Sequence, residues 1–128
     1  MVPAAARAHP RGMTTTEPQD AQARLVEAFA ARDVDAFLRV YEDGAALVVP
    51  PGDRVVRGRD QIRAVTEEML TTGGMFAIDV TDVLRVDGLA LVRTRWSLGE
   101  HQGRATVVVR EQPGGEWRIV LDDPTGEV

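Results

Sequence analysis

The second half of the sequence is a succession of strand-like segments joined by short turns, and this pattern limits the fold more than any other feature. Apolar and polar residues alternate over residues 76–86, 90–97, 105–110 and 116–122, as they do in strands that bury one face. Asp87-Gly88, between the first two segments, is typical of a two-residue hairpin turn of type I′. Four such segments in succession predict an antiparallel meander.

The alternation also predicts which side chains share a face and where the sheet bends. In the second segment one face carries Ala90, Val92, Thr94 and Trp96. In the first segment the alternation slips between Val80 and Leu84, which indicates a β-bulge near Asp82. A bulge at that position would bend the sheet.

Helical periodicity precedes the meander. The apolar faces of the first two predicted helices are Ala21, Leu25, Ala28 and Phe29, and then Val34, Phe37, Leu38 and Tyr41. The second helix is expected to run from Asp33 as its N-cap to Gly44, with a short strand over residues 46–49 after it. A third helix is expected to open at Gly58 and to stop at Gly73-Gly74.

Three N-terminal helices packed on a curved antiparallel sheet define an α+β fold. Because a bent sheet of this size does not close on itself, its concave face and the helices would enclose a pocket in a cone-shaped domain. The 128 residues suffice for one domain. Residues 1–15 have no periodic apolar face, so we expect a disordered tail there and a folded domain over residues 16–128.

Composition excludes several classes of chemistry. The sequence has no cysteine, so disulfides and thiolate nucleophiles are excluded and a cytoplasmic location is expected. All 15 basic residues are arginine, which removes lysine Schiff-base catalysis and, with abundant Ala, Val and Gly, indicates an actinobacterium-like source. A net charge of −5 argues against nucleic acid or an anionic membrane as the partner.

Nucleophilic and metal catalysis find little support in the sequence. Ser97 is the only serine and is expected to point opposite Trp96, away from the pocket. His101 is the only histidine of the predicted domain, and its expected place is a hairpin loop without a ligand-spaced partner, so no metal site is expected. There is no phosphate-binding loop, and no cofactor is expected. No apolar run approaches the ~18 residues of a membrane span.

Three segments are distinctive: residues 31–37 (ARDVDAF), 41–45 (YEDGA) and 56–62 (VRGRDQI). Together they resemble the nuclear-transport-factor-2-like superfamily, which includes ketosteroid isomerase and the SnoaL-like cyclases. The ending, residues 117–126, looks like the DUF4440 subgroup, which includes the SgcJ/EcaC type of natural-product gene clusters. The resemblance covers about residues 17–126 and implies the cone-shaped fold of this superfamily. Since that fold hosts isomerases, cyclases, dehydratases and binding modules, it implies no single activity.

The catalytic positions of the superfamily can be compared with this sequence residue by residue. In an alignment with ketosteroid isomerase, the tyrosine of the first helix falls on Leu25, the base on Val49 and the oxyanion-hole aspartate near Val107. These side chains cannot transfer protons, so ketosteroid isomerase activity is not expected. The Asp-Arg-Asp pattern of limonene epoxide hydrolase is also missing, because no aspartate stands beside Arg93 and Arg95.

Asp122 and Tyr41 are the candidate catalytic residues. The resemblance to SnoaL-like cyclases implies that Asp122 faces the pocket as an acid or base, with a pKa raised by burial. Strand alternation puts it on the face opposite Trp117 and Ile119, and the alternative is an exposed aspartate that caps the strand end. Tyr41 would donate a hydrogen bond to a ligand or fill the core. His101 is a further candidate, since SnoaL-like cyclases use a histidine.

The expected ligand is a small apolar molecule. The residues predicted to line its pocket are Leu25, Phe29, Val49, Met69, Val92, Thr94, Trp96 and Val107. Three hypotheses follow: a cofactor-free isomerase, cyclase or dehydratase; a non-catalytic ligand-binding protein; or a dimeric interaction domain whose pocket is filled by side chains. A homodimer is also predicted, because a second sheet face carries Leu89, Leu91, Val108 and the stems of Arg93 and Arg95.

Overall fold

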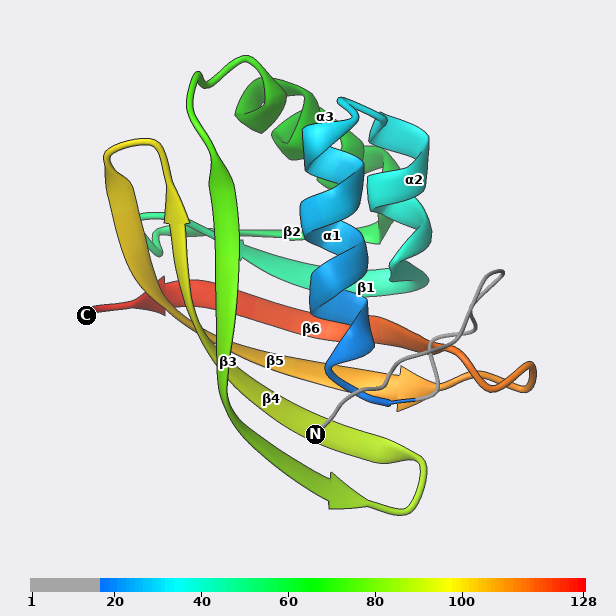
Figure 1. The fold of residues 1–128 in the computed structure, drawn as a ribbon. Coiled ribbons are helices and arrows are strands. Elements are labelled where there is room, and N and C mark those ends of the chain that lie inside the picture. The colour runs from blue at the N-terminus through cyan, green and yellow to red at the C-terminus, as the bar shows by residue number, and fades with distance from the viewer. Residues whose placement is uncertain (1–16) are drawn as a thin grey trace.

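The computed structural model describes residues 17–128, and this part of the chain forms three helices and six strands (Figure 1). In chain order they are α1 (Asp20–Ala30), α2 (Val34–Arg39), β1 (Tyr41–Val49), β2 (Arg54–Arg57), α3 (Gly58–Leu70), β3 (Phe76–Val86), β4 (Leu89–Leu98), β5 (His101–Glu111) and β6 (Trp117–Gly126). The predicted tail over residues 1–15 lies outside the described residues, as does residue 16.

The six strands form one curved sheet in the order β2-β1-β6-β5-β4-β3. The meander from β3 to β6 is antiparallel, as predicted. The prediction of a wholly antiparallel sheet is wrong, however, because β1 pairs with β6 in parallel. No local pattern reveals this pairing, since β2, α3 and the rest of the meander separate the two strands. All three helices lie on one side of the curved sheet (Figure 1), which confirms an α+β fold.

The second helix is shorter than predicted. It ends at Arg39, whereas the sequence pattern extended it to Gly44, and Tyr41 begins β1. The backbone carbonyl of Val40 accepts a hydrogen bond from the Ile119 N–H at 2.7 Å. Pairing with β6 therefore replaces the helical turn that the apolar spacing predicted, as tertiary contacts often override local propensity. The change moves Tyr41 from the end of a helix to the beginning of a strand.

The predicted hairpin and bulge in the meander are both confirmed. Two residues separate the paired ends of β3 and β4, as predicted. Asp87 has a positive φ of 53°, but Gly88 does not have a positive φ, so the predicted type I′ is wrong. The register of these strands shifts between Val80, which pairs with Thr94, and Asp82, which pairs with Arg93. Thr94 is buried and Arg93 is exposed, so β4 presents its predicted face to the helices.

Two glycines bring the chain before β3 against the chain after β4. Gly74 and Gly99 have φ values of 105° and 60°. A Cβ added to Gly74 would lie 2.6 Å from the Gly99 Cα, and one added to Gly99 would lie 2.9 Å from the Gly73 carbonyl oxygen. Only glycine allows both the backbone conformation and the close approach. The contact fixes the paired strand ends, Phe76 and Leu98, against each other.

Gly74→Ala should lower the free energy of unfolding by about 2 kcal/mol or more, because the added methyl group meets backbone atoms at a positive φ. Gly73→Ala is the matched control, since no atom lies within 4 Å of its added Cβ, and it should change stability by less than about 0.5 kcal/mol. Urea unfolding followed by circular dichroism measures both variants. Equal stabilities for the two would contradict the close contact.

Candidate functional site

A cavity of about 510 Å³ lies between the helices and the concave face of the sheet. Its volume is in the range of small-molecule sites, roughly 300–1,000 Å³. Most of the wall is apolar, and the buried polar residues in it are Gln22, Tyr41, Thr66, Thr94 and Asp122. An open cavity is not what the hypothesis of a pocket filled by side chains predicts.

Tyr41 and Asp122 form a buried, hydrogen-bonded pair in the cavity wall. The Tyr41 hydroxyl donates to Oδ2 of Asp122 at 2.8 Å, and the two residues are 2% and 8% exposed. Burial raises the pKa of Asp122 from 3.8 to about 6, the hydrogen bond from Tyr41 opposes this rise, and the Asp123 carboxylate adds to it. Burial and the negative charge of Asp122 raise the pKa of Tyr41 well above 10, so Tyr41 stays a phenol.

A β-bulge in β6 turns Asp122 into the cavity. Ile119 and Leu121 pair with two adjacent residues of β5, which makes Val120 an extra residue in β6. Strict alternation predicted Leu121 on the face of Ile119 and Asp122 on the opposite face. That prediction is wrong, because Leu121 is 42% exposed and Asp122 is 8% exposed. The bulge also overturns the alternative of a water-facing Asp122 at the strand end.

The parallel pairing of β1 with β6 brings Tyr41 within reach of Asp122. Tyr41 is paired with Ile119, and further along the two strands Leu47 is paired with Asp122. A register shift between Tyr41 and Ala46 takes up the larger number of residues on β1. The Tyr41 side chain is long enough to span the offset from Ile119 to Asp122 and to place its hydroxyl on the carboxylate.

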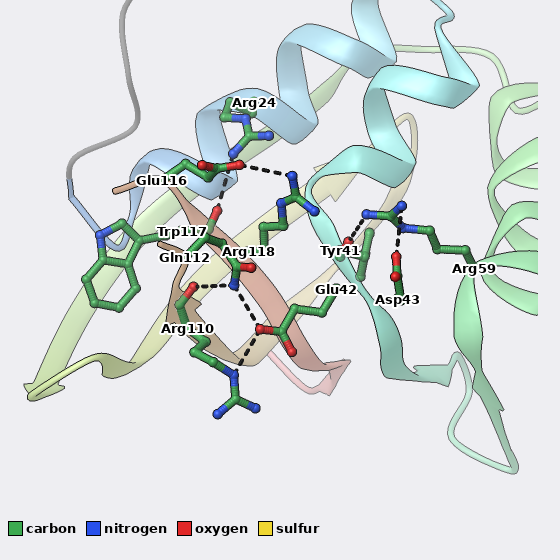
Figure 2. Close-up of polar contacts among 10 residues, drawn as sticks. All are labelled: Arg24, Tyr41, Glu42, Asp43, Arg59, Arg110, Gln112, Glu116, Trp117 and Arg118. Carbon is green, nitrogen blue, oxygen red and sulfur yellow. Dashed lines mark hydrogen bonds and ion pairs between the residues drawn. The ribbon is translucent and has the colours of Figure 1, made fainter. Parts of the chain in front are cut away.

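Arg59, in the first turn of α3, binds the irregular part of β1. Its Nη2 donates to the backbone carbonyl of Tyr41 at 2.8 Å, and its Nη1 forms an ion pair with Asp43 at 3.0 Å (Figure 2). The Asp43 side chain is 89% exposed, so this ion pair alone contributes little, about 0–1 kcal/mol. The part-buried hydrogen bond to the Tyr41 carbonyl is the stronger constraint, and it ties the position of the Tyr41 backbone to α3.

Glu42 connects the same segment to the end of β5. Its Oε2 accepts hydrogen bonds from Arg110 Nε at 2.9 Å and from Gln112 Nε2 at 2.8 Å (Figure 2). The residue after Tyr41 is thus held by β5, while the Tyr41 carbonyl is held by α3. Contacts to two different elements fix the backbone from which the Tyr41 ring extends.

Five of the eight residues predicted to line the pocket do line the cavity: Leu25, Met69, Thr94, Trp96 and Val107. The other three lie elsewhere. Phe29 packs on Phe76 with ring centroids 5.2 Å apart, Val92 is completely buried in the core, and Val49 is half-buried at the end of β1. The reason is that side chains from α1 and the sheet fill part of the concave side, so residues there pack against one another.

The sequence pattern did not single out Gln22 or Thr66. Gln22 lies about one turn before Leu25 on the buried face of α1, and a polar residue within an apolar stripe was the available signal. The Thr66 hydroxyl donates to the Ile62 carbonyl at 2.8 Å, so its own helix satisfies it. His101, which we expected in a loop, begins β5 and lines the cavity with an exposed side chain.

Within residues 17–128, no three His, Asp or Glu side chains are placed to hold a metal ion together. None of the helices in this part of the chain is long and apolar enough to cross a membrane.

The sequence matches the family model of the SnoaL-like domain over residues 23–121. The chain therefore belongs to the SnoaL-like domain family, which confirms the predicted resemblance to SnoaL-like proteins. The resemblance of residues 117–126 to the SgcJ/EcaC type stays a prediction. No curated protein matches the chain.

Solved structures of other proteins share this fold. An association domain assigned to calcium/calmodulin-dependent protein kinase type II, from Thiobacillus denitrificans, is 21% identical with a TM-score of 0.71, over 88% of this chain and 98% of that one. A ketosteroid isomerase-like protein from Erwinia carotovora atroseptica is 20% identical with a TM-score of 0.66, over 83% and 90%. A protein assigned as a dehydratase of the NTF2-like family, from Streptomyces avermitilis, is 19% identical with a TM-score of 0.66, over 80% and 88%. Likeness at these identities establishes the NTF2-like fold alone.

Asp122→Asn should remove a pH dependence from the stability of the protein. A carboxyl with a pKa of about 6 in the folded protein binds its proton more tightly than in the unfolded chain, where the pKa is ~3.9. The free energy of unfolding therefore falls as pH rises from about 4 to about 6 and levels off above that. Asparagine still accepts the Tyr41 hydrogen bond but does not titrate, so the free energy of unfolding of the variant does not fall over this pH range. The variant should therefore be about 1–3 kcal/mol more stable than wild type at pH 7.

Urea unfolding of both proteins between about pH 3.5 and 7.5 measures this difference. Asp79→Asn, at an exposed position of β3, is the control and should leave the pH dependence of wild type intact. A stability difference between wild type and Asp122→Asn that stays constant with pH would contradict a raised pKa at Asp122.

Proposed function

We propose that this protein binds a small apolar carbonyl compound in the cavity and catalyses proton transfer on it without a cofactor. Asp122 is the acid and base, and Tyr41 is its hydrogen-bond donor. The observation that carries the proposal is the buried pair of these two residues in a mostly apolar cavity. Isomerisation, aldol-type cyclisation and dehydration all use such a step.

The environment of Asp122 suits a general base at neutral pH. With a pKa of about 6 the carboxylate is mostly ionised at pH 7 and is more basic than an ordinary aspartate. It would remove a proton from the carbon next to a carbonyl group, and the electron pair would move to the carbonyl oxygen. Once Asp122 is protonated, the Tyr41 hydroxyl no longer faces a negative charge and can donate to the enolate oxygen. Asp122 then returns the proton to a carbon of the product.

The relatives support a reaction of this type without defining it. One structural relative is named ketosteroid isomerase-like and another is assigned as a dehydratase. The residues at the aligned catalytic positions of ketosteroid isomerase, Leu25, Val49 and Val107, cannot transfer protons. We therefore propose a reaction that relies on Asp122 and Tyr41 instead.

Exchange of deuterium into 2-tetralone, followed by NMR in D₂O, tests proton abstraction before the natural substrate is known. The wild-type protein should accelerate exchange at the acidic CH₂ group over buffer, with a rate that rises through a pKa of about 6. Asp122→Asn should lower the protein-dependent rate by about 10²–10⁴-fold. Tyr41→Phe should move the inflection to higher pH, because the hydrogen bond that lowers the pKa of Asp122 is gone. Equal exchange by wild type and Asp122→Asn would refute the catalytic role.

A second candidate function is non-catalytic ligand binding. The observation that favours it is the apolar side chain at all three aligned catalytic positions, Leu25, Val49 and Val107. If wild type binds 2-tetralone in the cavity and leaves its exchange rate unchanged, this second function is the better account.

We also propose that the protein is a homodimer joined through the outer face of its sheet. Leu91, Val108 and Leu121 are paired across β4, β5 and β6, and they form an apolar stripe there. Leu121 is 42% exposed, and Leu89, at the beginning of β4, is 43% exposed. A stripe of this kind suits a self-complementary two-fold contact.

Light scattering at micromolar concentration should give a particle of about 28 kDa, twice the chain mass of 13.9 kDa. Leu121→Glu should shift the protein to the monomer, because it places two carboxylates in the stripe. Met75→Glu, at a residue that is 80% exposed and lies before β3, should leave the dimer intact. A wild-type particle of monomer mass would rule out the dimer.

A further inference from the structure

The side chain of Gln22 is a polar group for which the fold provides no partner. Gln22 is in the first turn of α1, is 3% exposed and lines the cavity. Its Nε2 has no hydrogen-bond acceptor among residues 17–128. A buried amide nitrogen in this situation destabilises the protein, because it has lost its hydrogen bonds to water.

Three other polar side chains of the cavity wall, Tyr41, Thr66 and Trp96, donate to partners within the protein. Tyr41 donates to Asp122 at 2.8 Å, and the Thr66 hydroxyl donates to a backbone carbonyl of its own helix at 2.8 Å. The Trp96 Nε1 donates to the Pro124 carbonyl at 3.0 Å. Gln22 differs from them, since its amide donor is left for whatever occupies the cavity.

Packing alone does not explain glutamine at this position. Leu25 and Phe29 follow Gln22 on the buried face of α1, and a leucine would fill the same space without a donor to satisfy. A carboxamide offers N–H donors and a carbonyl acceptor. A ligand carbonyl oxygen, which accepts and cannot donate, complements the N–H donors that the fold leaves unused.

We propose that Gln22 is a specificity-determining residue whose Nε2 donates a hydrogen bond to a carbonyl oxygen of the bound ligand. The ligand class is then an apolar ketone or enone and excludes a pure hydrocarbon. The inference deepens the proposed function of the same cavity and rests on ligand binding there. It does not require Asp122 to act as a base.

Calorimetric titration with 2-tetralone and tetralin tests this role, because the two probes share their ring system and differ in one carbonyl group. Gln22→Leu should lower the ratio of the 2-tetralone affinity to the tetralin affinity by about threefold to tenfold, the usual effect of one neutral hydrogen bond. The tetralin affinity itself should stay the same or rise. Gln102→Leu makes the same change at an exposed position of β5 that does not line the cavity, and it should leave the ratio unchanged.

An unchanged affinity ratio in Gln22→Leu would overturn the role of Gln22, as would an equal fall of the ratio in Gln102→Leu. Failure of both probes to bind wild type at millimolar concentration would overturn it too. Without ligand, Gln22→Leu should raise the melting temperature by roughly 3–6 °C, because an unsatisfied amide is removed. A lower melting temperature would show that the amide already has a partner in the fold and would also count against the role.

Asp122→Asn separates this inference from the proposed function. This variant should keep the preference for 2-tetralone while it loses deuterium exchange. If wild type shows no exchange but Gln22→Leu still loses the ketone preference, catalysis is wrong and the role of Gln22 stands. If Gln22→Leu keeps the preference for the ketone while exchange depends on Asp122, the role of Gln22 is wrong and catalysis by Asp122 stands.

Discussion

The parallel pairing of β1 with β6 is the contact on which the fold and the site both depend. Parallel strands require a crossover connection, and here it consists of β2, α3 and the first three strands of the meander. When β6 returns beside β1, it joins β1 and β2 to the meander in one sheet and brings Asp122 to the Tyr41 hydroxyl. The irregular pairing of both strands is part of this arrangement, because regular alternation on β6 would turn Asp122 to the outside.

At Asp122, burial and hydrogen bonding act in opposite directions, and burial wins. A hydrogen bond to a charged group contributes about 1.5–3 kcal/mol, and the bond from Tyr41 favours the ionised form. A pKa that is nevertheless raised from 3.8 to about 6 means that roughly 3 kcal/mol still favours the protonated form. One donor is thus too little to compensate for the loss of water. The carboxylate is left basic, and a second donor would remove that property.

The sequence was sufficient where structure depends on neighbouring residues and insufficient where it depends on distant ones. The position of the turn at Asp87, the bulge near Asp82 and the alternation of β4 are local features, and all three were predicted correctly. The end of α2 was misplaced, because strand pairing with Ile119 overrode helical spacing. Strand alternation predicted the wrong face for Asp122, since nothing in the sequence marks Val120 as an extra residue. The family resemblance gave the orientation that strand alternation missed.

Gln22 and Asp122 are the two points at which the cavity departs from the rules that stabilise a protein interior. The amide nitrogen is buried without an acceptor among residues 17–128, and the carboxylate is desolvated beyond what its single donor offsets. Without a ligand, the protein would be more stable with leucine in place of Gln22 and asparagine in place of Asp122. Natural proteins often give up stability of this kind at functional sites. The two departures lie on different elements, α1 and β6, and both face the same cavity. Imperfect packing alone does not explain why Gln22 and Asp122 lie in the same cavity wall. A ligand with a carbonyl group and an acidic carbon would interact with both.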